Sequence, residues 1–573
     1  MAAKCLGDLF RKSCARWPER TAMLVPGKGE FAPITYAELS ERVRGYAAAL
    51  LDLGVERGDR VAIQSDNCPE WAFTDWACQT LGAILVPLYP TLPADQSQYI
   101  VSDAGAKLLV AGAPEQAEKA EGLSGVRVML LKGAADSLDE HAKQSLGNLT
   151  IEAWDASIDA TKPEDVATII YTSGTTGSPK GAMLSHEGFT TLMEAILDTL
   201  PINENDRFLC FLPMSHVYER VGGQVLPIST GACIAFAGSL RSLASDMKTF
   251  KPTIMLCVPR FLESIRDKVV ETASKAPPLR RRLFSFGMDQ LVRRYRGQPA
   301  PLAGLMDKLV GAKVRELAGS DLRFFVSGGA ALPTHVAEFF LAFGMPMLQG
   351  YGLTETTAAS CLNHPDDNRP QTVGPPIRGV EIKIADDGEI LIRGKTRMIG
   401  YWNLPEETTA AIDGDGWFHS GDIGAFDGKN LKITDRKKDL LVLGNGKNVA
   451  PQPIENRLKE SPLIAEAVLF GDGMEYVCAL IIPNFEVLTQ VASQHGVSPA
   501  APEQMIELDA VKALMKAEVD KVNKTLAGFE MVKKHALVAA TFSIEGGELT
   551  PTMKVKRKVM KEKYAEVIST LMR

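Results

Sequence analysis

The residues from 171 to 181, YTSGTTGSPKG, combine the groups that bind a polyphosphate. Glycines let the backbone take left-handed turns and approach a ligand closely. Hydroxyls donate hydrogen bonds, consecutive N–H groups form an anion-binding concavity, and a lysine adds a positive charge. The residues that could serve in this way are Thr172, Ser173, Gly174, Thr175, Thr176, Gly177, Ser178, Lys180 and Gly181. The preceding segment, 166–171, is apolar and β-branched, so the loop is expected at the end of a buried strand.

This loop departs from the common phosphate-binding pattern, in which Gly-Lys is followed by Ser or Thr. Here Pro179 precedes Lys180 and Gly181 follows it. Because Gly, Ser, Thr and Pro are also ordinary turn residues, a surface turn between two strands is the alternative. The clustering of hydroxyls with a lysine favours the phosphate site.

Two further segments could bind the rest of a nucleotide. Residues 327–331, SGGAA, follow the apolar segment 322–326, and a turn of small residues at a strand end can admit a flat ring such as adenine. Residues 349–356, QGYGLTET, offer the aromatic face of Tyr351 and the carboxylate of Glu355. That carboxylate could hold Mg²⁺ together with phosphate oxygens. For Glu355 a helix cap is the alternative.

An acidic residue and a basic run lie further along the chain. Asp422, at the end of the segment 416–422 (GWFHSGD), is expected in a tight loop. It could accept hydrogen bonds from both ribose hydroxyls, or serve as an ordinary turn residue. The segment 549–558, LTPTMKVKRK, is basic, and for Lys556 and Lys558 we expect a solvated, charged face.

The composition indicates a globular chain of at least two domains. At 573 residues the chain is too long for one core, and 45% hydrophobic and 23% charged residues are ordinary values. The net charge of −7 argues against a general nucleic-acid binder. Nine scattered cysteines without a C-x-x-C pair indicate neither disulfides nor zinc and fit a reducing cytoplasm. The first residues lack the apolar core of a signal peptide, and no apolar run is long enough to span a bilayer.

Helical and strand patterns alternate through the first half of the chain, which places the polar loops at strand ends. Helices are expected over 37–50 and 71–81, and strands over 59–64 and 84–88. This alternation is typical of layered α/β domains with mostly parallel sheets.

The pattern changes near residue 380. The segments 380–384 and 389–393 alternate apolar and polar residues around the turn 386–388, which predicts a small antiparallel β unit. The segment 431–440 then runs from a strand into a charged turn, where we expect a domain boundary. The remainder is expected to be a compact α+β module with a helix over 510–526.

Taken in this order, YTSGTTGSPKG, YGLTET, GWFHSGD and TDRKKDL resemble the motifs of the adenylate-forming, AMP-binding superfamily of acyl-CoA synthetases. The resemblance covers nearly the whole chain, and an insert at about 261–320 and the TPTMKVKRK ending are similar to the long-chain fatty acid–CoA ligase branch. It implies an α/β fold in which residues 1–435 form a large adenylation domain of layered α/β subdomains with a small β unit. Residues 436–573 would form a small, mobile α+β domain.

The resemblance also implies a reaction in two halves. A fatty acid carboxylate attacks the α-phosphorus of MgATP, which gives acyl-AMP and pyrophosphate, and the thiol of coenzyme A then attacks the acyl carbon and expels AMP. ATP, coenzyme A and a fatty acid are thus the implied substrates, and Mg²⁺ the implied cofactor. By matched motif, the implied ATP-binding residues are Thr172, Ser173, Gly174, Thr175, Thr176, Gly177, Lys180, Gly328, Gly329, Ala330, Tyr351, Gly352, Thr354, Asp422 and Arg436.

The same resemblance assigns the catalytic and metal-binding groups. Thr175 and Glu355 would hold Mg²⁺, and Lys554 would bridge the carboxylate and the α-phosphate during adenylation. His216 would lie beside those groups, and a histidine that makes only local hydrogen bonds is its alternative. The usual S-G-K around the catalytic lysine is Thr552-Met553-Lys554 here, so the local geometry of that turn stays open.

Asp435 and Lys438 match the hinge of the family, about which the small domain would rotate between the half-reactions. The rotation would withdraw Lys554 and present the implied coenzyme A-binding residues, which are Gly444, Gly446 and Lys447.

The insert interleaves apolar residues with arginines in 279–284, LRRRLF, and in 291–296, LVRRYR. A basic amphipathic helix can lie on anionic lipid, and a solvated helical hairpin is the alternative. The protein is accordingly expected in the cytoplasm, with or without peripheral membrane contact. At the N-terminus, helical spacing of Leu6, Leu9, Phe10, Cys14 and Trp17 predicts a helix docked on its own domain.

Two other functions stay open. One is a fatty acyl-AMP ligase that delivers its acyl group to the phosphopantetheine arm of a carrier protein. The other is a non-catalytic nucleotide- or lipid-binding protein, which the joint presence of Glu355, Asp422 and Lys554 disfavours. Neither the preferred acyl chain length nor the oligomeric state is predicted, because neither depends on a motif.

Overall fold

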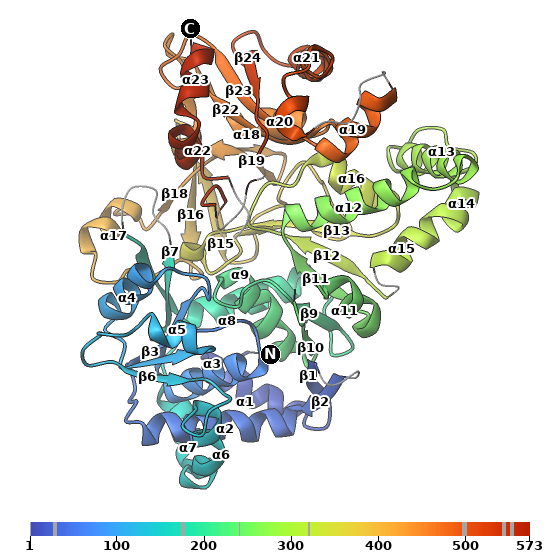
Figure 1. Ribbon diagram of the computed structural model, residues 1–573. Helices are drawn as coiled ribbons and strands as arrows, with labels where there is room; N and C mark the ends of the chain where they lie inside the picture. Colours follow the sequence, from blue (N-terminus) through green and yellow to red (C-terminus); the bar gives the residue numbers. More distant parts are fainter. Residues whose placement is uncertain are drawn as a thin grey trace.

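The structure is a computed structural model that describes residues 2–26, 31–172, 178–239, 241–318, 321–494, 501–540, 542, 546–549 and 555–572. A large α/β body is formed by the first three quarters of the chain, and a smaller α+β lobe at the C-terminus lies on one end of it (Figure 1). This arrangement confirms the expected fold class.

Two sheets with mostly parallel inner strands form the body. The first has the order β14-β13-β12-β11-β9-β10-β1-β2. Its strands are β1 (Thr21–Pro26), β2 (Phe31–Thr35), β9 (Arg207–Cys210), β10 (Cys233–Phe236), β11 (Ile254–Cys257), β12 (Phe324–Ser327), β13 (Met347–Tyr351) and β14 (Cys361–Leu362). Antiparallel pairing occurs only where β2 and β14 flank it, among the described residues.

The second sheet has the order β17-β8-β7-β4-β3-β5-β6. Its strands are β3 (Arg60–Gln64), β4 (Ile84–Leu88), β5 (Leu108–Ala111), β6 (Arg127–Leu130), β7 (Val166–Thr172), β8 (Lys180–Ser185) and β17 (Gly400–Tyr401). The expected strands at 59–64 and 84–88 are thus confirmed, as is the buried strand before the polar loop.

Helices cover these sheets and share one large and two smaller apolar cores with them. The helices of the first half are α1 (Leu6–Arg16), α2 (Tyr36–Asp52), α3 (Pro69–Leu81), α4 (Ala94–Asp103), α5 (Pro114–Glu118), α6 (Leu138–Ser145), α7 (Ile151–Ala160) and α8 (His186–Thr199). The helix α3 is buried along its length, begins with proline at its first turn and ends at Gly82, whose φ of 71° is left-handed.

The remaining helices of the body before residue 343 lie around the strands of the first sheet and in the insert. They are α9 (Val217–Glu219), the π-helical turn η2 (Arg220–Val225), α10 (Leu226–Thr230), α11 (Leu243–Phe250), α12 (Pro259–Ser274), α13 (Pro278–Tyr295), α14 (Ala303–Met306), the π-helical turn η3 (Asp307–Gly311), α15 (Ala312–Ala318) and α16 (Thr334–Ala342). In the described part of the chain, no helix is long and apolar enough to cross a membrane.

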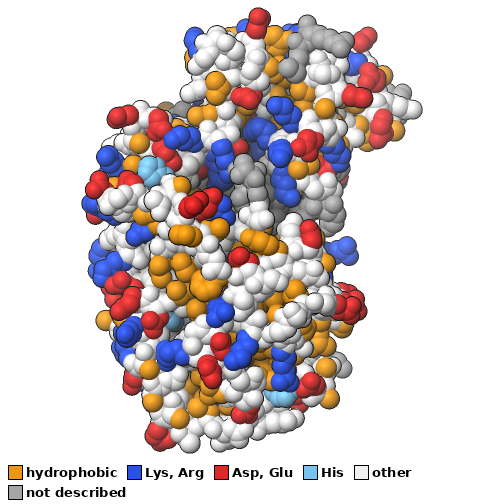
Figure 2. Space-filling model, turned by 90° about the vertical axis from the view of Figure 1, so that its left-hand side faces the viewer, with side chains coloured by type: hydrophobic (Ala, Val, Ile, Leu, Met, Phe, Trp, Pro, Cys, Tyr) orange, Lys and Arg blue, Asp and Glu red, His pale blue; other side chains and the backbone are white. Residues whose placement is uncertain are grey.

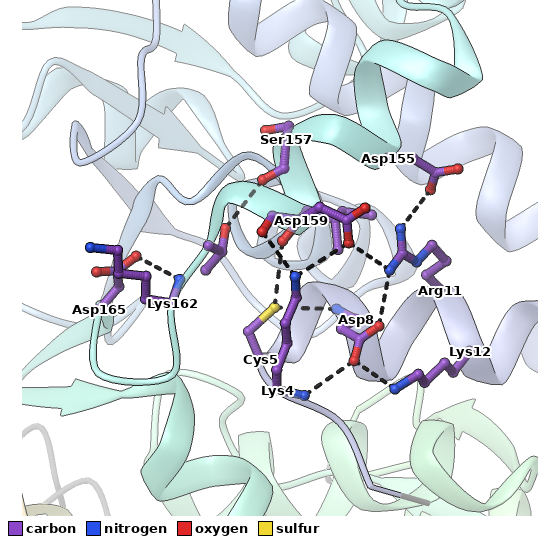
Figure 3. A network of polar contacts seen from close by, with 12 residues as sticks. Lys4, Cys5, Asp8, Arg11, Lys12, Asp155, Ser157, Asp159, Lys162 and Asp165 are labelled. Carbon is purple, nitrogen blue, oxygen red and sulfur yellow. Dashed lines mark hydrogen bonds and ion pairs between the residues drawn. The ribbon is translucent and has the colours of Figure 1, made fainter.

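The N-terminal helix α1 is docked on the body, as its spacing predicted. Leu6, Leu9 and Phe10 are buried, and the Phe10 ring stacks on Trp76 of α3 at 5.0 Å between centroids. On its outer side Arg11 bridges to Asp155 at 3.2 Å and to Asp159 at 2.9 Å, both on α7 (Figure 3). Buried apolar contacts and charged groups on two elements therefore fasten α1 to α3 and α7.

The small β unit expected near residue 380 is a sheet with the order β15-β16-β18-β19. It comprises β15 (Val380–Ile384), β16 (Glu389–Gly394), β18 (Phe418–Asp427) and β19 (Asn430–Arg436), with α17 (Pro405–Ala411) beside it. The expectation that Asp422 lies in a tight loop was wrong. Asp422 lies within β18 and is paired with Arg436 of β19, because the antiparallel ladder continues through the glycine turn that suggested a loop.

The C-terminal lobe has apolar cores of its own, which contain no residue before Leu441 among their buried members. Its strands are β20 (Leu441–Val442), β21 (Asn448–Val449), β22 (Ile464–Phe470), β23 (Val477–Pro483) and β24 (Val532–Leu537). Its helices are α18 (Pro451–Leu458), α19 (Phe485–Gln494), α20 (Pro502–Met505), α21 (Asp509–Asn523), α22 (Arg557–Lys563) and α23 (Ala565–Met572). The expected helix at 510–526 corresponds to α21.

Candidate active site

A cleft of about 1550 Å³ separates the C-terminal lobe from the body. Figure 2 shows the hollow between the two, with Lys and Arg side chains along it. Among the predicted site residues, those that line the cleft are Gly329, Ala330, Tyr351, Gly352, Asp422, Asp435, Arg436 and Lys438. These residues come from four separate segments of the sequence, so the fold brings most of the predicted adenine and ribose residues to one place.

Tyr351, Asp422 and Arg436 form a connected group on the body's side of the cleft. Tyr351, the last residue of β13, donates its hydroxyl to Oδ2 of Asp422 at 2.7 Å. Arg436 places Nε 3.2 Å from Oδ1 of the same carboxylate. Burial and the neighbouring Asp422 raise the pKa of Tyr351, so the phenol stays protonated and continues to donate. A carboxylate has further lone pairs, so Asp422 could also accept from ribose hydroxyls.

The polar loop joins β7 to β8, because Thr172 and Lys180 are paired across these two strands. Ser173, Gly174, Thr175, Thr176 and Gly177 lie outside the described residues. The Lys180 ammonium forms an ion pair with Glu407 of α17 and lies 5.4 Å from the ring centroid of Tyr401. Among the described residues of the loop, Ser178 and Pro179 line the cleft.

Glu355 and Thr354 lie in a single 3-10 turn, η4 (Thr354–Thr356), that follows β13. The Tyr401 hydroxyl donates to Oε1 of Glu355 at 3.0 Å, and the Met398 N–H donates to the Glu355 carbonyl at 2.7 Å. The helix-cap alternative does not apply, since no side-chain capping bond of Glu355 is present in the described turn. Tyr401 therefore links the predicted metal carboxylate to the lysine of the loop.

Residues 328–330 make a turn of small residues directly after β12. A Cβ atom on Gly328 would lie only 3.0 Å from the ring of Tyr218, and Gly329 has a left-handed φ of 78°. The Tyr218 hydroxyl donates to the Val326 carbonyl at 2.7 Å, which fixes its ring beneath the turn. Gly328 therefore permits a close approach to Tyr218, and Gly329 a conformation that other residues rarely adopt.

His216 caps the short helix α9. Its Nδ1 accepts a hydrogen bond from the Tyr218 N–H at 3.1 Å, and its ring lies 6.5 Å from that of Tyr89. This local bond fits the alternative stated for His216, and it also fixes the ring's orientation and tautomer.

Asp435 and Lys438, the predicted hinge residues, lie where β19 ends and the lobe begins. Asp435 accepts from the N–H of Gln452 in the first turn of α18 at 3.0 Å, and from its neighbour Arg436 at 2.7 Å. Burial raises the pKa of Asp435 to about 6. Partial burial and the neighbouring Arg436 lower the pKa of Lys438. The carboxyl of Asp435 thus holds a helix of the lobe against the last strand of the body.

The lobe's side of the cleft is organised around a buried ion pair. Arg557 of α22 places its Nη1 2.7 Å from Oε1 of Glu455 and donates to the Leu469 carbonyl at 2.5 Å. Lys554 lies outside the described residues, three positions before Arg557. Lys556 and Lys558 are exposed, as expected, and they also line the cleft.

Gly444, Gly446 and Lys447, the predicted coenzyme A-binding residues, lie at the tip of the β20–β21 hairpin and are absent from the lining of the cleft. Gly446 has a left-handed φ of 78°, and the Lys447 ammonium lies 4.7 Å from the ring centroid of Phe529.

One described cluster of charges crosses the cleft. Glu466 of β22 lies 3.2 Å from Arg260 on α12 of the body and 3.1 Å from Lys459 of the lobe. Glu263, one turn after Arg260, is largely buried, and this burial raises its pKa. The pair between Arg260 and Glu466 therefore ties the two parts together on the side of the cleft formed by α12.

Several residues of the site were missed in the sequence. They are Tyr218, Tyr401, Glu407, Gln452, Glu455, Glu466 and Arg557. None lies in a motif with a spacing that indicates its partner, because each contacts a residue far away in the chain. Tyr401 alone offered a signal, since the segment Gly400-Tyr401-Trp402 pairs an aromatic residue with a strand-breaking glycine.

Comparison with known proteins gives one family match for the body and another for the C-terminal lobe. A family model described as AMP-binding enzyme matches residues 10–402, and one described as AMP-binding enzyme C-terminal domain matches residues 438–573. The chain therefore belongs to the AMP-binding enzymes.

Among the relatives of similar sequence are ligases of long-chain fatty acids. The chain is similar to long-chain-fatty-acid–CoA ligase FadD15 of Mycobacterium bovis, with 33% identity over 95% of this chain and 93% of the relative. It is also similar to long-chain-fatty-acid–CoA ligase 5 of Rattus norvegicus, with 32% identity over 94% of this chain and 84% of the relative.

Solved structures share the fold. A fatty acyl CoA synthetase of Mycobacterium tuberculosis has a TM-score of 0.64 and 24% identity, over 98% of this chain and 99% of that one. The anthranilate CoA ligase AuaEII, in complex with anthranoyl-AMP, has a TM-score of 0.75 and 21% identity, over 100% and 99% of the two chains.

Proposed function

We propose that this AMP-binding enzyme activates long-chain fatty acids to acyl-CoA, with ATP as the energy source and AMP and pyrophosphate as products. The observation that carries the proposal is the cleft, in which Tyr351, Asp422 and Arg436 face the C-terminal lobe, and the sequence of that lobe includes Lys554. The relatives named as long-chain-fatty-acid–CoA ligases align over nearly the whole chain, which supports this substrate class.

The chemistry requires positioning more than covalent catalysis. A carboxylate is a poor electrophile because oxide is a poor leaving group, and AMP replaces it with a good one. On this proposal Asp422 and Arg436 orient the ribose, Tyr351 and residues 328–330 enclose the adenine, and Lys554 neutralises charge as the carboxylate approaches the α-phosphorus. On the same proposal His216 would help to orient the carboxylate.

The donor set fits Mg²⁺ bound mainly through phosphate oxygens. Glu355 is a hard oxygen ligand, Thr175 offers a hydroxyl, and no cluster of three or more ligands occurs in the described part of the chain. Such a set suits Mg²⁺, which commonly binds one or two carboxylates together with the phosphates of its nucleotide. When bound, Mg²⁺ would offset the negative charge of those phosphates. The Tyr401 hydroxyl would hold Glu355 in place.

The two half-reactions would use two positions of the lobe. We place the boundary at residues 435 and 436, with Asp435 and Lys438 as the hinge. A rotation there would break the contacts of Arg260 with Glu466, withdraw Lys554 and bring Gly444, Gly446 and Lys447 to the cleft for coenzyme A. All nine cysteines are free thiols, which suits the cytoplasm as the compartment.

The experiment is fatty acid-dependent pyrophosphate release, followed by product analysis with coenzyme A. A panel of saturated acids from hexanoate to eicosanoate tests the substrate class, and the long-chain acids should give the highest kcat/KM. Highest activity with short acids would contradict the proposed substrate class. No release with any acid would contradict the ligase itself.

The acceptor is tested in the same assay. With free coenzyme A we expect acyl-CoA, and with a phosphopantetheinylated carrier protein in its place we expect little transfer. The reverse result would identify a fatty acyl-AMP ligase.

A further inference from the structure

The insert carries most of the large apolar side chains that lie exposed. Twelve such residues occur in the described parts of the chain, and seven of them lie between 279 and 309. Leu279 is the most exposed of all, at 81%. Solvent contact by single apolar residues is normal, but a local concentration of this kind marks an interaction surface.

These side chains form two stripes. On α13, Leu279, Leu283 and Phe286 recur at spacings of four and three residues, which places them along one line of the helix. Before and along α14 and η3, Leu302, Leu305 and Leu309 recur at spacings of three and four residues. Each helical segment therefore has an apolar line that no other part of the described chain covers.

The two stripes face the same side of the insert. A Cβ atom on Gly287 of α13 would lie 2.9 Å from Val310 of η3, and the Leu302 N–H donates to Gln290 at 3.3 Å. Positions later in α13 thus meet positions earlier in the second segment, so the two run antiparallel. Around the axis of its own helix, each stripe is rotated by about a quarter turn from the residues that touch the other segment, and in the same rotational sense. In an antiparallel pair this equal offset directs both stripes to one face.

The insert is held as a fixed element at the edge of the body (Figure 1). The opposite face of α13 packs on α16, where the ring of Phe284 stacks on Phe343 at 6.4 Å between centroids and Leu291 is fully buried. Arg296 pairs with Glu338 of α16 at 2.6 Å. The exposed face is therefore ordered before it meets any partner.

The charge of this region is opposite to that of the rest of the chain. Residues 278–315 contain nine Lys and Arg and two Asp, a formal charge of +7 in a chain whose net charge is −7. Arg280, Arg281 and Arg282 are exposed and have no ion-pair partner among the described residues. Arg280 and Arg282 flank the line of Leu279 and Leu283 around the helix, so cationic and apolar groups share one surface.

We propose that this hairpin of α13, α14 and η3 rests on an anionic lipid surface, with its two apolar stripes among the acyl chains and its arginines against headgroup phosphates. Arginine binds phosphate oxygens with two N–H groups at once, and basic amphipathic helices lie at such interfaces. A second copy of the chain is a poor partner, because two surfaces of the same positive charge would repel each other. The inference does not depend on the proposed ligase activity.

The test is co-flotation of the full chain with vesicles. Binding is expected to vesicles of phosphatidylcholine with about one third phosphatidylglycerol, to be weak with phosphatidylcholine alone, and to fall as salt is raised. Equal binding to both vesicle types, or no binding to either, would overturn the proposal.

Two sets of variants assign the effect to the hairpin. Changing Arg280, Arg281 and Arg282 together to Gln should weaken binding about 100-fold, and the double variant Leu279→Ser with Leu283→Ser about 10-fold or more. The control changes three exposed basic residues elsewhere, Arg127, Lys162 and Lys383, to Gln, with the same loss of charge. If the control loses as much binding as the arginine variant, net charge and not this surface is responsible.

Two further measurements complete the test. Circular dichroism and the thermal midpoint check that each variant is folded, which is expected because the altered side chains are exposed. The molecular mass in solution, measured for the parent chain and the leucine variant, distinguishes a self-association surface. A dimer that the leucine variant dissociates would overturn the lipid assignment.

Discussion

The two sides of the cleft are built differently. On the body's side, Tyr351, Asp422 and Arg436 are bonded to one another and extend from strands that belong to the large buried core. On the lobe's side, Arg557 and Glu455 are bonded to each other, within cores that contain only residues of the lobe. The body's side, which we propose binds the nucleotide, is thus a platform built on the large core, and the lobe's side is a separate unit whose described ties to it are few.

This difference suits the proposed site, in which the body would keep its position while the lobe takes a different position in each half-reaction. Among the described residues, ties between the two parts include the Asp435 bond to Gln452, the ion pair of Arg260 with Glu466, and the ion pairs of Lys437 with Asp387 and Glu389. A partly exposed ion pair contributes about 0.2–1 kcal/mol, so such ties are easily broken and remade. The buried platform has no comparable freedom.

The largest effect should come from the movable side. Lys554→Ala is expected to lower fatty acid-dependent pyrophosphate release by about 10³-fold, because the variant lacks the ammonium proposed to offset the charge that develops at the α-phosphorus. Formation of acyl-CoA from supplied acyl-AMP should be largely spared. Stopped-flow or quench measurements of each half-reaction test this, with Lys556→Ala as the neighbouring control. Equal losses in both halves would remove Lys554 from this role.

A smaller effect is expected from the platform. Asp422→Asn removes the charge that holds Arg436 and is proposed to bind the ribose, so KM for ATP should rise about 10- to 100-fold in both steady-state and adenylation assays. Tyr351→Phe removes one hydrogen bond to the same carboxylate and should raise KM less. If Asp422→Asn instead lowers kcat with KM unchanged, Asp422 acts outside nucleotide binding.

A still smaller effect is expected from the tie across the cleft. Arg260→Ala leaves Glu466 paired with Lys459 inside the lobe, so the lobe should leave this position more readily. We expect the two half-reactions to change in opposite directions by about 2- to 5-fold. Lys268→Ala on the same helix is the control, because Lys268 pairs only with Glu271 among the described residues. Parallel changes of both half-reactions would show that the tie does not select a position.

The smallest effect on activity is expected from Glu219, a fully buried carboxyl in α9 of the body. Burial raises the pKa of Glu219 to about 8, from 4.5 for an exposed glutamate. Between those values the folded chain keeps a proton that the unfolded chain has lost, so the free energy of unfolding falls as the pH rises from about 4.5 to about 8.

Glu219→Gln keeps the shape without an ionisable proton. It should flatten the decline of the thermal midpoint across this pH range and change kcat at neutral pH by less than about twofold. Thermal scans at a series of pH values, with the parent chain as control, measure this. An unchanged pH slope in the variant would show that Glu219 is not the group that titrates.

The sequence predicted the residues of the platform better than their contacts. The strands and turns that carry Tyr351, Gly329 and Asp422 have local patterns, because period-two alternation and glycine turns are properties of neighbouring residues. Tyr401 and Glu355 are 46 positions apart, and Arg260 and Glu466 are 206 apart, so no local pattern records that they meet. The placement of Asp422 in a loop was wrong for the converse reason, since a ladder with β19 overrides a local turn signal.

In the insert too, the sequence shows the residues but not which of them are exposed. Its arginines and leucines are evident in the sequence, but a helix hidden against the body and a helix facing outward can share that composition. Exposure of Leu279, Leu283 and Phe286 follows from the packing of α13 on α16, which depends on the antiparallel hairpin. The proposal of a lipid surface in place of a solvated hairpin therefore rests on the fold and not on the composition.

The contacts of α1 with distant parts of the chain affect how the protein folds during its synthesis. The Leu6 N–H bonds His186, and Lys4 bonds Asp159, at sequence separations of 180 and 155 residues. At about 5–20 residues per second, a ribosome needs roughly 10–40 s to synthesise those partners. Through this interval α1 can pack on α2 and α3 but not on α7 and α8, so part of its buried side stays exposed until those helices emerge, and early-binding chaperones should favour its folding.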